Sequence, residues 1–458
     1  MKKTLLEIAN WLQIDCKDFG DTVVTGVSID TRTIKKGDLF IPFKGEKVNG
    51  HQYVQKAFEN GAAATLWMNS EPNPPENVPV LFVEDPEIAL QEMARQYRNE
   101  HKATFIGITG SNGKTSSKDI LASALSPYFK VQKTIGNFNN QLGLPITILS
   151  LDEDTEIAVL EMGMSGFGEI EFLSTLARPH YAVITNIGEA HMQDLGSREG
   201  IAKAKFEIIK GLDEHGVLFY DGDEPLLQNL VGKEPNLNVE SFGFNHENSL
   251  IATNIVTTEK GSRFDVCGEL NGEFFIPVLG KHQVKNALNA MLIAKSLGLR
   301  DDQIHFGIEQ AKLTDMRMQL VPTSDRILFI NDAYNAAPTS MTAAIQFIQT
   351  TTMRSEKWLV LGDMLELGED EKHFHESISN VIDESKIDKV CLFGPRMKWL
   401  YEKLQEKFAH ENIIHTEDDY DQIVQFIKKY ANENSLILLK GSRGMKLETI
   451  LKSFVLNQ

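Results

Sequence analysis

Short runs of apolar residues alternate with turns through the first hundred residues of the chain. The runs at Val23–Ile29, Leu39–Pro42 and Val80–Val83 predict short strands. Apolar side chains at helical spacing predict a helix over about Glu87–Glu100. The N-terminal residues MKKTLLEIANWLQ predict an amphipathic helix rather than a secretory signal, because polar side chains soon interrupt the apolar positions. This pattern indicates a small α/β domain.

A regular alternation of buried strands and helices begins at about residue 105. Strands are predicted at Phe105–Thr109, Ile157–Glu161, Tyr181–Asn186 and Val217–Tyr220. Helical patterns separate these runs, and a long helix is predicted over Gly280–Leu297. Strands that alternate with helices favour a doubly wound, mostly parallel sheet.

The same alternation returns in the last third of the chain, after a boundary near Lys312–Met318. Strands are predicted at Ile327–Asp332, Trp358–Leu361, Lys389–Phe393 and Leu436–Leu439. Loops of glycine and polar residues follow three of these strands, and ligands of open α/β sheets bind beyond the carboxyl ends of strands. We therefore expect three α/β domains, over residues 1–100, 101–313 and 314–458, with the chemistry between them.

Composition narrows the classes of protein to which the chain can belong. A length of 458 residues suits three domains, and no stretch is apolar enough for a transmembrane helix. Three widely spaced cysteines fit a reducing compartment without a disulfide framework. The net charge of −18 argues against a nucleic-acid partner, although an anionic small molecule remains possible. We expect a cytoplasmic protein, and nothing in the sequence requires more than a monomer.

The segment Gly107–Ser116 has the pattern of a phosphate-binding loop. A predicted strand enters it, glycines allow the backbone N–H groups to turn inward, and a helix leaves it. Lys114 can reach the β- and γ-phosphates of a nucleotide, and the Thr115 hydroxyl can bind Mg²⁺. The glycine falls at Gly110 rather than at the strict P-loop position, so an ordinary Gly-rich turn is the alternative. ATP binding is the function that the segment favours.

Three further side chains follow predicted strands or face inward from a helix. Glu161 ends a strand and can hold Mg²⁺, the alternative being a solvated carboxylate. His191 follows another strand end and can be a ligand or a structural histidine. In the predicted helix Ile201–Lys210, Lys205 shares the apolar face while Lys203 points elsewhere. Lys205 therefore either snorkels to solvent or faces a metal or phosphate site.

Together these residues resemble the pattern of the Mur ligases, the ATP-dependent amide-forming enzymes of peptidoglycan precursor synthesis. The resemblance extends from about Ser28 to Gly444. The matching blocks are TGSNGKT at Thr109–Thr115, GNFNNQLGLP at Gly136–Pro145, GKHQVKN at Gly280–Asn286, DAYNAAPTSM at Asp332–Met341, VLGDMLELGE at Val360–Glu369, and Leu438–Gly444. The resemblance implies a central P-loop-type sheet, a Rossmann-like C-terminal α/β domain and a smaller N-terminal α/β domain.

The resemblance also implies a reaction. Within the family, the blocks are similar to those of members that join D-alanyl-D-alanine to UDP-N-acetylmuramoyl-tripeptide through an acyl phosphate, with ADP and phosphate as the other products. A sister Mur ligase that adds the third stem residue, a folylpolyglutamate synthase and a P-loop NTPase switch remain as alternatives. The YNAAP and GDMLELG blocks argue against the sister ligase, and the N-terminal loops do not suit a folate enzyme.

The site residues that the resemblance implies fall into three groups. The expected ATP contacts are Gly110, Ser111, Asn112, Gly113, Lys114, Thr115, Ser116, Asn286, Arg317 and Asp332. Thr115 and Glu161 are expected to bind one Mg²⁺, and His191 with a carbamylated Lys205 a second; Lys114, His191 and Lys205 are the expected catalytic residues. The expected substrate contacts are Ser28, Asp30, Arg32, Gly45, Asn49, Gly50, His51, Asn137, Asn139, Asn140 and, for the dipeptide, Asn335. Relatives usually have His-Asn where this chain has His282-Gln283.

Overall fold

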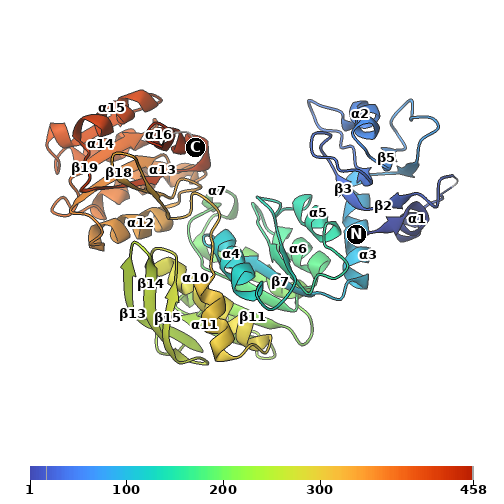
Figure 1. Cartoon of the computed structure of the whole chain (residues 1–458), viewed down its shortest axis with the longest axis horizontal. Helices are drawn as coiled ribbons and strands as arrows, with labels where there is room; N and C mark the ends of the chain where they lie inside the picture. Colours follow the sequence, from blue (N-terminus) through green and yellow to red (C-terminus); the bar gives the residue numbers. More distant parts are fainter. Residues whose placement is uncertain (17, 456–458) are drawn as a thin grey trace.

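The chain forms three α/β domains in a computed structural model that describes residues 1–16 and 18–455 (Figure 1). The central domain lies at the base of the view in Figure 1, and the N- and C-terminal domains lie above it on opposite sides. In the part of the chain that the structure describes, no helix is both long and apolar enough to cross a membrane.

The N-terminal domain is built on a parallel sheet whose strands follow chain order. This sheet contains β3 (Gly26–Ser28), β4 (Asp38–Phe40), β5 (Ala64–Met68) and β6 (Val80–Val83). A separate antiparallel pair contains β1 (Lys3–Thr4) and β2 (Val23–Val24). The helices are α1 (Leu5–Leu12), α2 (Val54–Glu59) and α3 (Pro86–Glu100). The structure confirms the two predicted helices and adds β5, which the sequence analysis did not predict.

Local capping explains where the two long helices of this domain begin. Thr4 and Glu7 form a capping box at the start of α1, with each side chain accepting a hydrogen bond from the other's backbone N–H. Asp85 caps α3 by accepting from the N–H groups of Glu87 and Ile88, and Pro86 occupies the first turn, where it needs no donor.

The central sheet has the order β15-β14-β13-β12-β11-β10-β7-β9-β8. Its strands are β7 (Thr104–Thr109), β8 (Val131–Lys133), β9 (Ile157–Glu161), β10 (Tyr181–Ile184), β11 (Val217–Asp221), β12 (Asn238–Gly243), β13 (Leu250–Thr258), β14 (Gly261–Gly268) and β15 (Gly272–Ile276). Pairing is parallel from β8 to β13, which confirms the predicted mostly parallel sheet. The antiparallel extension β13-β14-β15 was not predicted.

Helices of the central domain connect these strands. They are α4 (Lys114–Leu125), α5 (Gly143–Leu149), α6 (Glu169–Ala177), α7 (Met192–Leu195), α8 (Arg198–Phe206), α9 (Pro225–Val231), α10 (Lys281–Ser296) and α11 (Asp301–Glu309). The helix predicted over Ile201–Lys210 begins earlier, because Ser197 caps it by accepting from the Gly200 N–H. It also ends earlier, where the chain tightens into the 3₁₀ helix η2 (Glu207–Gly211).

The C-terminal sheet has the order β16-β17-β21-β18-β19-β20 and is parallel except for its edge strand β16. Its strands are β16 (Gln319–Pro322), β17 (Leu328–Asn331), β18 (Glu356–Gly362), β19 (Lys389–Phe393), β20 (Ile413–Thr416) and β21 (Ser435–Lys440). The helices are α12 (Pro338–Thr350), α13 (Glu371–Ser377), α14 (Met397–Leu404), α15 (Tyr420–Tyr430) and α16 (Glu448–Lys452). Each strand predicted in this region is present.

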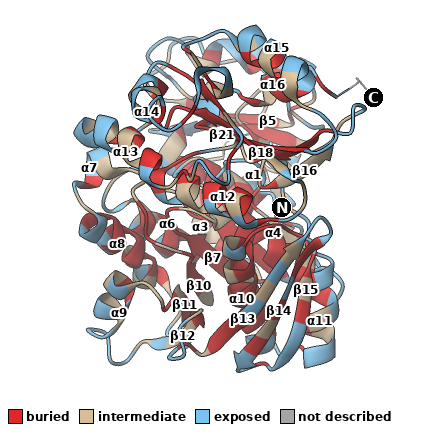
Figure 2. Ribbon diagram, turned by 90° about the vertical axis from the view of Figure 1, so that its left-hand side faces the viewer, coloured by how far each residue is buried: buried red, intermediate tan, exposed pale blue. Residues whose placement is uncertain are grey.

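Figure 2 shows buried residues in red along the sheets and on parts of the helices. The apolar clusters that such residues form do not follow the three domains one to one. One continuous cluster joins Leu90 and Met93 of α3 to Ile148 of α5 and Leu173 of α6, so the N-terminal and central domains share a core. A second cluster fills the other face of the central sheet. Two further clusters cover the two faces of the C-terminal sheet.

Candidate active site

The phosphate-binding loop lies between the end of β7 and the start of α4. Its two glycines have positive φ angles, 147° at Gly110 and 81° at Gly113, which side chains rarely tolerate. A Cβ at Gly110 would overlap Thr185 Oγ1. Thr185 Oγ1 donates to the Asn112 carbonyl at 2.5 Å, and the Asn112 N–H donates to Asn186 Oδ1 at 2.9 Å. The end of β10 therefore fixes the shape of the loop.

Lys114, Thr115 and Glu161 meet at the first turn of α4. The Lys114 ammonium donates to the Gly110 carbonyl at 2.7 Å, and Thr115 Oγ1 donates to Glu161 Oε2 at 2.9 Å. Asn139 Nδ2 donates to Glu161 Oε1 at 2.9 Å, so a residue of the predicted GNFNN substrate block reaches the same carboxylate. Burial lowers the pKa of Lys114, while the Glu161 carboxylate opposes that shift.

Lys118 belongs to this cluster, although the sequence analysis did not single it out. Its ammonium lies 3.7 Å from Glu161 Oε2 and donates to the Thr134 carbonyl at 2.9 Å. Burial is the main cause that lowers its pKa. Lys114 and Lys118 are four residues apart, about one helical turn. This spacing in the sequence could have predicted that both ammonium groups lie on the same side of the helix.

His191 and Lys205 lie in reach of Lys114. Lys205 is only 1 % exposed, and burial, reinforced by the Lys114 ammonium, holds its pKa well below the usual value. Burial, with Lys205 and Lys114, lowers the pKa of His191 to about 4. His191 also has a left-handed backbone, with φ of 67°. Lys203 on the same helix is exposed, as the helical pattern predicted.

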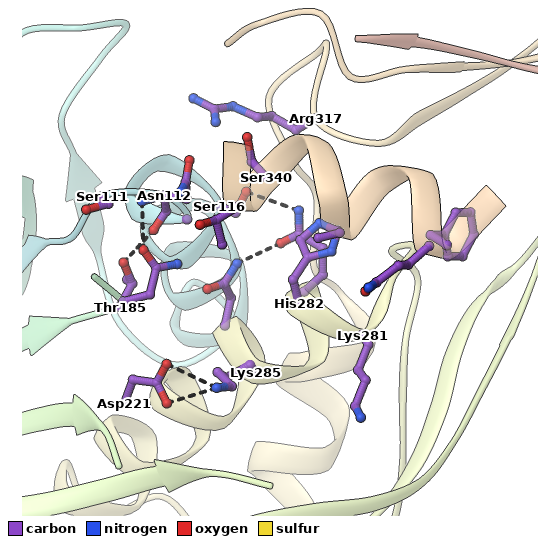
Figure 3. Close-up of a pocket in the computed structure, with 18 of the residues that line it drawn as sticks. Ser111, Asn112, Ser116, Thr185, Asp221, Lys281, His282, Lys285, Arg317 and Ser340 are labelled. Atoms are coloured by element: carbon purple, nitrogen blue, oxygen red, sulfur yellow. Dashed lines mark hydrogen bonds and ion pairs between the residues drawn. The ribbon is translucent and has the colours of Figure 1, made fainter. Parts of the chain in front are cut away.

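A cavity of about 1270 Å³ opens between the central and C-terminal domains (Figure 3). Ser111, Asn112 and Ser116 approach it from the phosphate-binding loop and α4, and Ser340 approaches it from α12. Among its lining residues are the predicted ATP contacts Ser111, Asn112, Gly113, Lys114, Thr115, Ser116, Asn286, Arg317 and Asp332, together with Glu161, Asn139 and Asn335. Gly110, His191 and Lys205 are not among the described residues that line it.

Gln283 ties helix α10 to helix α4, and Asn286 supports Gln283 from within α10. Gln283 Nε2 donates to Ser116 Oγ at 3.3 Å, and Asn286 Nδ2 donates to Gln283 Oε1 at 2.9 Å. Both side chains are buried. The glutamine that departs from the usual family residue is therefore engaged by the phosphate-binding helix rather than held free for a ligand.

The cavity wall also holds a group of three charged residues that the sequence analysis did not predict. The Lys285 ammonium donates to Asp221 Oδ1 at 2.9 Å and lies 2.9 Å from Asp223 Oδ2, a pairing visible in Figure 3 for Asp221. Burial raises the pKa of Asp221, and Lys285 opposes that shift. Lys281 and Lys285 also lie over the Phe244 ring, at 4.5 and 5.0 Å from its centre.

The linker between the central and C-terminal domains, residues 312–317, forms hydrogen bonds along one side of α4. The Lys312 N–H donates to Ser123 Oγ at 3.3 Å. The Thr314 N–H and hydroxyl donate to Asp119 Oδ2 at 2.9 and 2.7 Å. Closer to the phosphate-binding loop, Arg317 Nη2 donates to Thr115 Oγ1 at 3.0 Å.

We call Thr115, Asp119 and Ser123 the linker stripe. These residues are spaced by four positions, so they lie on one face of the helix. The linker stripe therefore connects the interdomain segment directly to the phosphate-binding turn.

Asp332 and Lys440 complete the wall that the C-terminal domain contributes. Lys440, 2 % exposed, donates to Asp332 Oδ2 at 2.5 Å and to the Asn335 carbonyl at 3.2 Å. Asp332 Oδ1 accepts from the Met318 N–H at 3.1 Å. The predicted loop Lys440-Gly-Ser-Arg443 marked this region, but the sequence did not identify Lys440 itself as a site residue.

The predicted N-terminal substrate residues form a separate group, and none of those described lines the cavity. Asp30 pairs with Arg32 at 2.6 Å, and the Arg32 guanidinium lowers the pKa of Asp30 to about 2. Asn49 Oδ1 accepts from the His51 N–H at 3.1 Å, and His51 Nε2 accepts from the Met68 N–H at 3.2 Å. These contacts fix the loops locally.

The other predicted substrate residues of this group have local roles or lie at the surface. A Cβ at Gly50 would lie 2.7 Å from the Phe43 carbonyl oxygen, whereas one at Gly45 would make only an ordinary contact. Ser28 is buried and donates to the Asp30 carbonyl at 3.0 Å. Asn137 and Asn140 are exposed on the central domain, where Asn140 Oδ1 accepts from the Gly143 N–H at 2.9 Å.

Several polar atoms in or beside the cavity are buried without a protein partner. They are Thr109 Oγ1 and Asn112 Nδ2 of the phosphate-binding strand and loop, and Arg317 Nε of the linker. Buried polar groups are normally satisfied, so these atoms indicate that a polar ligand belongs there. Within residues 1–16 and 18–455, no group of three or more His, Cys, Asp and Glu side chains could hold a metal ion by itself.

Comparison with known proteins matches this arrangement over the whole chain. The family Mur ligase middle domain matches residues 108–294, the Mur ligase glutamate ligase domain matches residues 316–443, and the Mur ligase catalytic domain matches residues 23–98. The UDP-N-acetylmuramoyl-tripeptide–D-alanyl-D-alanine ligase of Bacillus subtilis is 46 % identical over 457 residues, covering 99 % of each chain. The chain belongs to the Mur ligase family.

Solved structures agree with this assignment. The structure of MurF from Acinetobacter baumannii superposes on this Mur ligase with a TM-score of 0.89, at 28 % identity and over 99 % of each chain. MurF ligase from Thermotoga maritima, in complex with ADP, has a TM-score of 0.83 at 28 % identity and covers 94 % of this chain and 97 % of its own. The Mur ligase fold predicted from the sequence motifs is thereby confirmed.

Proposed function

We propose that this chain joins D-alanyl-D-alanine to UDP-N-acetylmuramoyl-tripeptide in an ATP-dependent reaction that yields the pentapeptide precursor of peptidoglycan. The observation that supports this most directly is 46 % identity over 99 % of both chains to a ligase of that name. The sister ligase and the NTPase switch are not favoured, because that relative and a solved MurF structure each span 99 % of this chain.

ATP binding is supported by the geometry of the cavity between the central and C-terminal domains. The backbone N–H groups of the first turn of α4 and the Lys114 ammonium face the place where phosphates bind in such loops. The unpartnered Asn112 Nδ2 and Arg317 Nε add donors of matching chemistry. We place the nucleotide between Gly110–Ser116 and Asn286 on one side and Arg317 and Asp332 on the other.

The oxygen donors of Thr115 and Glu161 fit one Mg²⁺, which prefers hydroxyl, carboxylate and phosphate oxygens. His191 with an unmodified Lys205 does not fit a second ion, because the lysine offers no anionic oxygen donor. A bound Mg²⁺ neutralises charge on the phosphoryl oxygens. The protein groups that share this task are Lys114 and Lys118, which lie on the same side of α4.

Carbamylation of Lys205 would remove this conflict. Burial and Lys114 favour the neutral amine of Lys205, which is the form that attacks CO₂. The amine nitrogen bonds to the CO₂ carbon and loses one proton, so a neutral amine becomes a carbamate anion. That anion offers two oxygen donors beside His191, and the two residues together then fit a second Mg²⁺.

The ligation needs no nucleophile from the protein. The tripeptide carboxylate attacks the γ-phosphorus of ATP, ADP leaves, and the resulting acyl phosphate is attacked by the free amine of the dipeptide. Collapse of the tetrahedral adduct forms the amide, and phosphate and a proton are released. Closure of the C-terminal domain onto the central domain would exclude water and limit hydrolysis of the acyl phosphate.

We assign the two peptide substrates to opposite ends of the site. The N-terminal loops with Ser28, Asp30, Arg32, Gly45, Asn49, Gly50 and His51 would bind the UDP-sugar, and Asn137, Asn139 and Asn140 would meet the same substrate from the central domain. Asn139 supports this assignment most strongly, since it already contacts Glu161. Asn335, exposed at the C-terminal wall, would approach the dipeptide.

Phosphate release with each substrate omitted in turn tests this proposal. The full mixture of ATP, Mg²⁺, UDP-N-acetylmuramoyl-tripeptide and D-alanyl-D-alanine is expected to release phosphate in step with pentapeptide product. Phosphate released without either peptide substrate would favour an NTPase switch. Activity on the dipeptide precursor with a diamino acid would favour the sister ligase.

A further inference from the structure

The loop that follows β18 rests on helix α7 of the central domain. A Cβ at Gly368 would lie 3.3 Å from the Gln193 Cα, so the two backbones approach closely at this point. Helix α7 starts directly after His191, and the docked loop brings Glu366 Oε2 to 3.9 Å from His191 Nδ1. Glu366 thus reaches His191 from the C-terminal domain, at a place beside the residues that line the cavity.

The neighbours of Glu366 in the chain hold its backbone in place, while its carboxylate is exposed. Met364 and Leu367 on either side are buried, and the Leu365 N–H donates to Ser442 Oγ at 2.9 Å. Glu366 itself has a left-handed backbone with φ of 64° and a side chain that is 76 % exposed. Strained residues persist where the surroundings determine them, and they cluster at ligand sites.

Glu366 lacks the bonded partner that three carboxylates lining the cavity have. Glu161 accepts from Thr115, Asp332 accepts from Lys440, and Glu189 accepts from Thr339. Among the described residues, the Glu366 carboxylate makes no hydrogen bond, since 3.9 Å from His191 is too long for one. Its negative charge is therefore available to a ligand.

The charge of the site explains which ligand group needs this carboxylate. Lys114 and Lys118 face the proposed place of phosphate transfer from α4 with ammonium groups, which suits phosphate and repels an ammonium. The incoming dipeptide presents an α-ammonium at neutral pH, and its nitrogen has to reach the acyl phosphate. An anionic side chain facing that place from the C-terminal domain would both bind and orient this ammonium.

We propose that Glu366 binds the α-ammonium of the incoming dipeptide and so positions the attacking nitrogen. This inference rests on the proposed function, and it adds a residue that selects substrates with a free amine. Asn335 and Glu366 would then contact the dipeptide from the loops at the carboxyl ends of β17 and β18, the two strands that flank β21 in the sheet.

Steady-state kinetics of Glu366→Gln tests the proposal, with Glu369→Gln as the control because Glu369 is an exposed carboxylate of the same loop. For Glu366→Gln we expect KM for D-alanyl-D-alanine to rise about tenfold or more, since a charge-assisted hydrogen bond is lost. KM for ATP, KM for UDP-N-acetylmuramoyl-tripeptide and the Mg²⁺ dependence should not change. Glu369→Gln should match the wild type in all of them, and equal melting temperatures would establish intact folding.

A ligand without the ammonium gives a second readout. D-lactoyl-D-alanine, with a hydroxyl in place of the amine, should inhibit the wild type much more weakly than D-alanyl-D-alanine binds, and Glu366→Gln should lose most of this discrimination. An unchanged KM for the dipeptide, or an equal rise in the Mg²⁺ requirement, would overturn the proposal. A wild type without ligase activity would instead overturn the proposed function, and this inference with it.

Discussion

Lys203 and Lys205 lie two residues apart on α8, yet Lys203 is exposed to solvent and Lys205 is buried, with 1 % of its surface exposed. Lys205→Met removes the amine but keeps a side chain of similar length. We expect ligase activity to fall about 100-fold or more, because a charge-stabilising group near the transferring phosphate is lost. The melting temperature should not fall, since replacing a buried amine by an apolar chain removes a desolvation cost.

Lys203→Met on the exposed side of the same helix is the matched control, and it should retain full activity. Coupled assays of phosphate release and thermal melts measure both variants. An inactive Lys203→Met, or an active Lys205→Met, would contradict the role given to the buried lysine.

Alanine substitutions at two glycines with positive φ distinguish the effect of backbone strain from the effect of steric overlap. Gly110→Ala combines a φ of 147° with overlap of Thr185 Oγ1, whereas Gly136→Ala has a φ of 57° and nothing within 4 Å. We expect Gly136→Ala to cost about 1 kcal/mol of unfolding free energy and to leave ATP affinity unchanged. Gly110→Ala should abolish measurable ATP binding by calorimetry. Equal effects of the two substitutions would contradict the role of Thr185 in shaping the loop.

The site residues that could be predicted lie in recognisable sequence blocks. Thr115 and Glu161 were expected at one Mg²⁺ from the resemblance, and the two side chains do meet, because the adjacent parallel strands β7 and β9 end at the same edge of the sheet. Lys118 and Lys440 were missed because their burial depends on strands and loops far away in the sequence. The metal and substrate roles of the predicted residues stay predictions.

At the scale of the element, α4 is both the phosphate-binding helix and the support of the interdomain linker. Asp119→Ala removes the carboxylate that Thr314, Lys133 and Lys118 share. It leaves Lys133 without its ion-pair partner and the buried Lys118 with Glu161 as its one remaining carboxylate partner among the described residues. We expect the free energy of unfolding to fall by about 3 kcal/mol. Ser123→Ala, which removes one weak acceptor of the same stripe, should cost no more than about 1 kcal/mol. Denaturant titrations measure both.

The stability that Asp119 provides should depend on pH. Burial raises its pKa, but Lys118, Lys133 and Thr314 outweigh burial, so the pKa in the folded protein is lowered. A lowered folded-state pKa gives stability that is present above the unfolded-state value of about 3.9 and is lost as the pH falls further. The difference in unfolding free energy between wild type and Asp119→Ala should therefore shrink below that pH. A difference that grows in acid would contradict this sign.

The elements that the sequence could predict were those with a strong local pattern. The strands Phe105–Thr109 and Ile157–Glu161 were short buried runs and are present. The antiparallel extension β13–β15 was not predicted, because its exposed residues break the apolar runs. The end of α8 was misplaced, since a 3₁₀ turn continues the same spacing of apolar side chains for a few residues.

At the scale of the whole molecule, the core that the N-terminal and central domains share predicts which parts of the chain can fold alone. Removing residues 1–100 would expose Leu144 and Ile148, which the N-terminal helices now cover, and each exposed side chain costs about 1.5–3 kcal/mol. A fragment of residues 101–313 should therefore lack a cooperative thermal transition. A fragment of residues 314–458 should fold alone, because its sheet has apolar clusters on both faces. Calorimetry of the two fragments tests this, and a cooperative 101–313 fragment would contradict it.

The arrangement of the domains could not be predicted from the sequence, because the contacts that fix it join residues that are far apart along the chain. Glu189 of the central domain accepts from Thr339 of α12, and Glu259 of the β13–β14 turn pairs with Arg354 of the C-terminal domain. Exposed polar residues of this kind have no distinctive pattern along the chain. Three domains could be expected, but not the faces through which they meet.

The linker stripe also has a consequence for antibacterial design. The segment from Lys312 to Thr314 lies along α4, where it bonds to Ser123 and Asp119 rather than to the predicted ATP contacts. A compound bound between this segment and Asp119 would separate the half of the enzyme that activates the acid from the half that delivers the amine. Its selectivity would come from this seam between domains instead of from the nucleotide pocket.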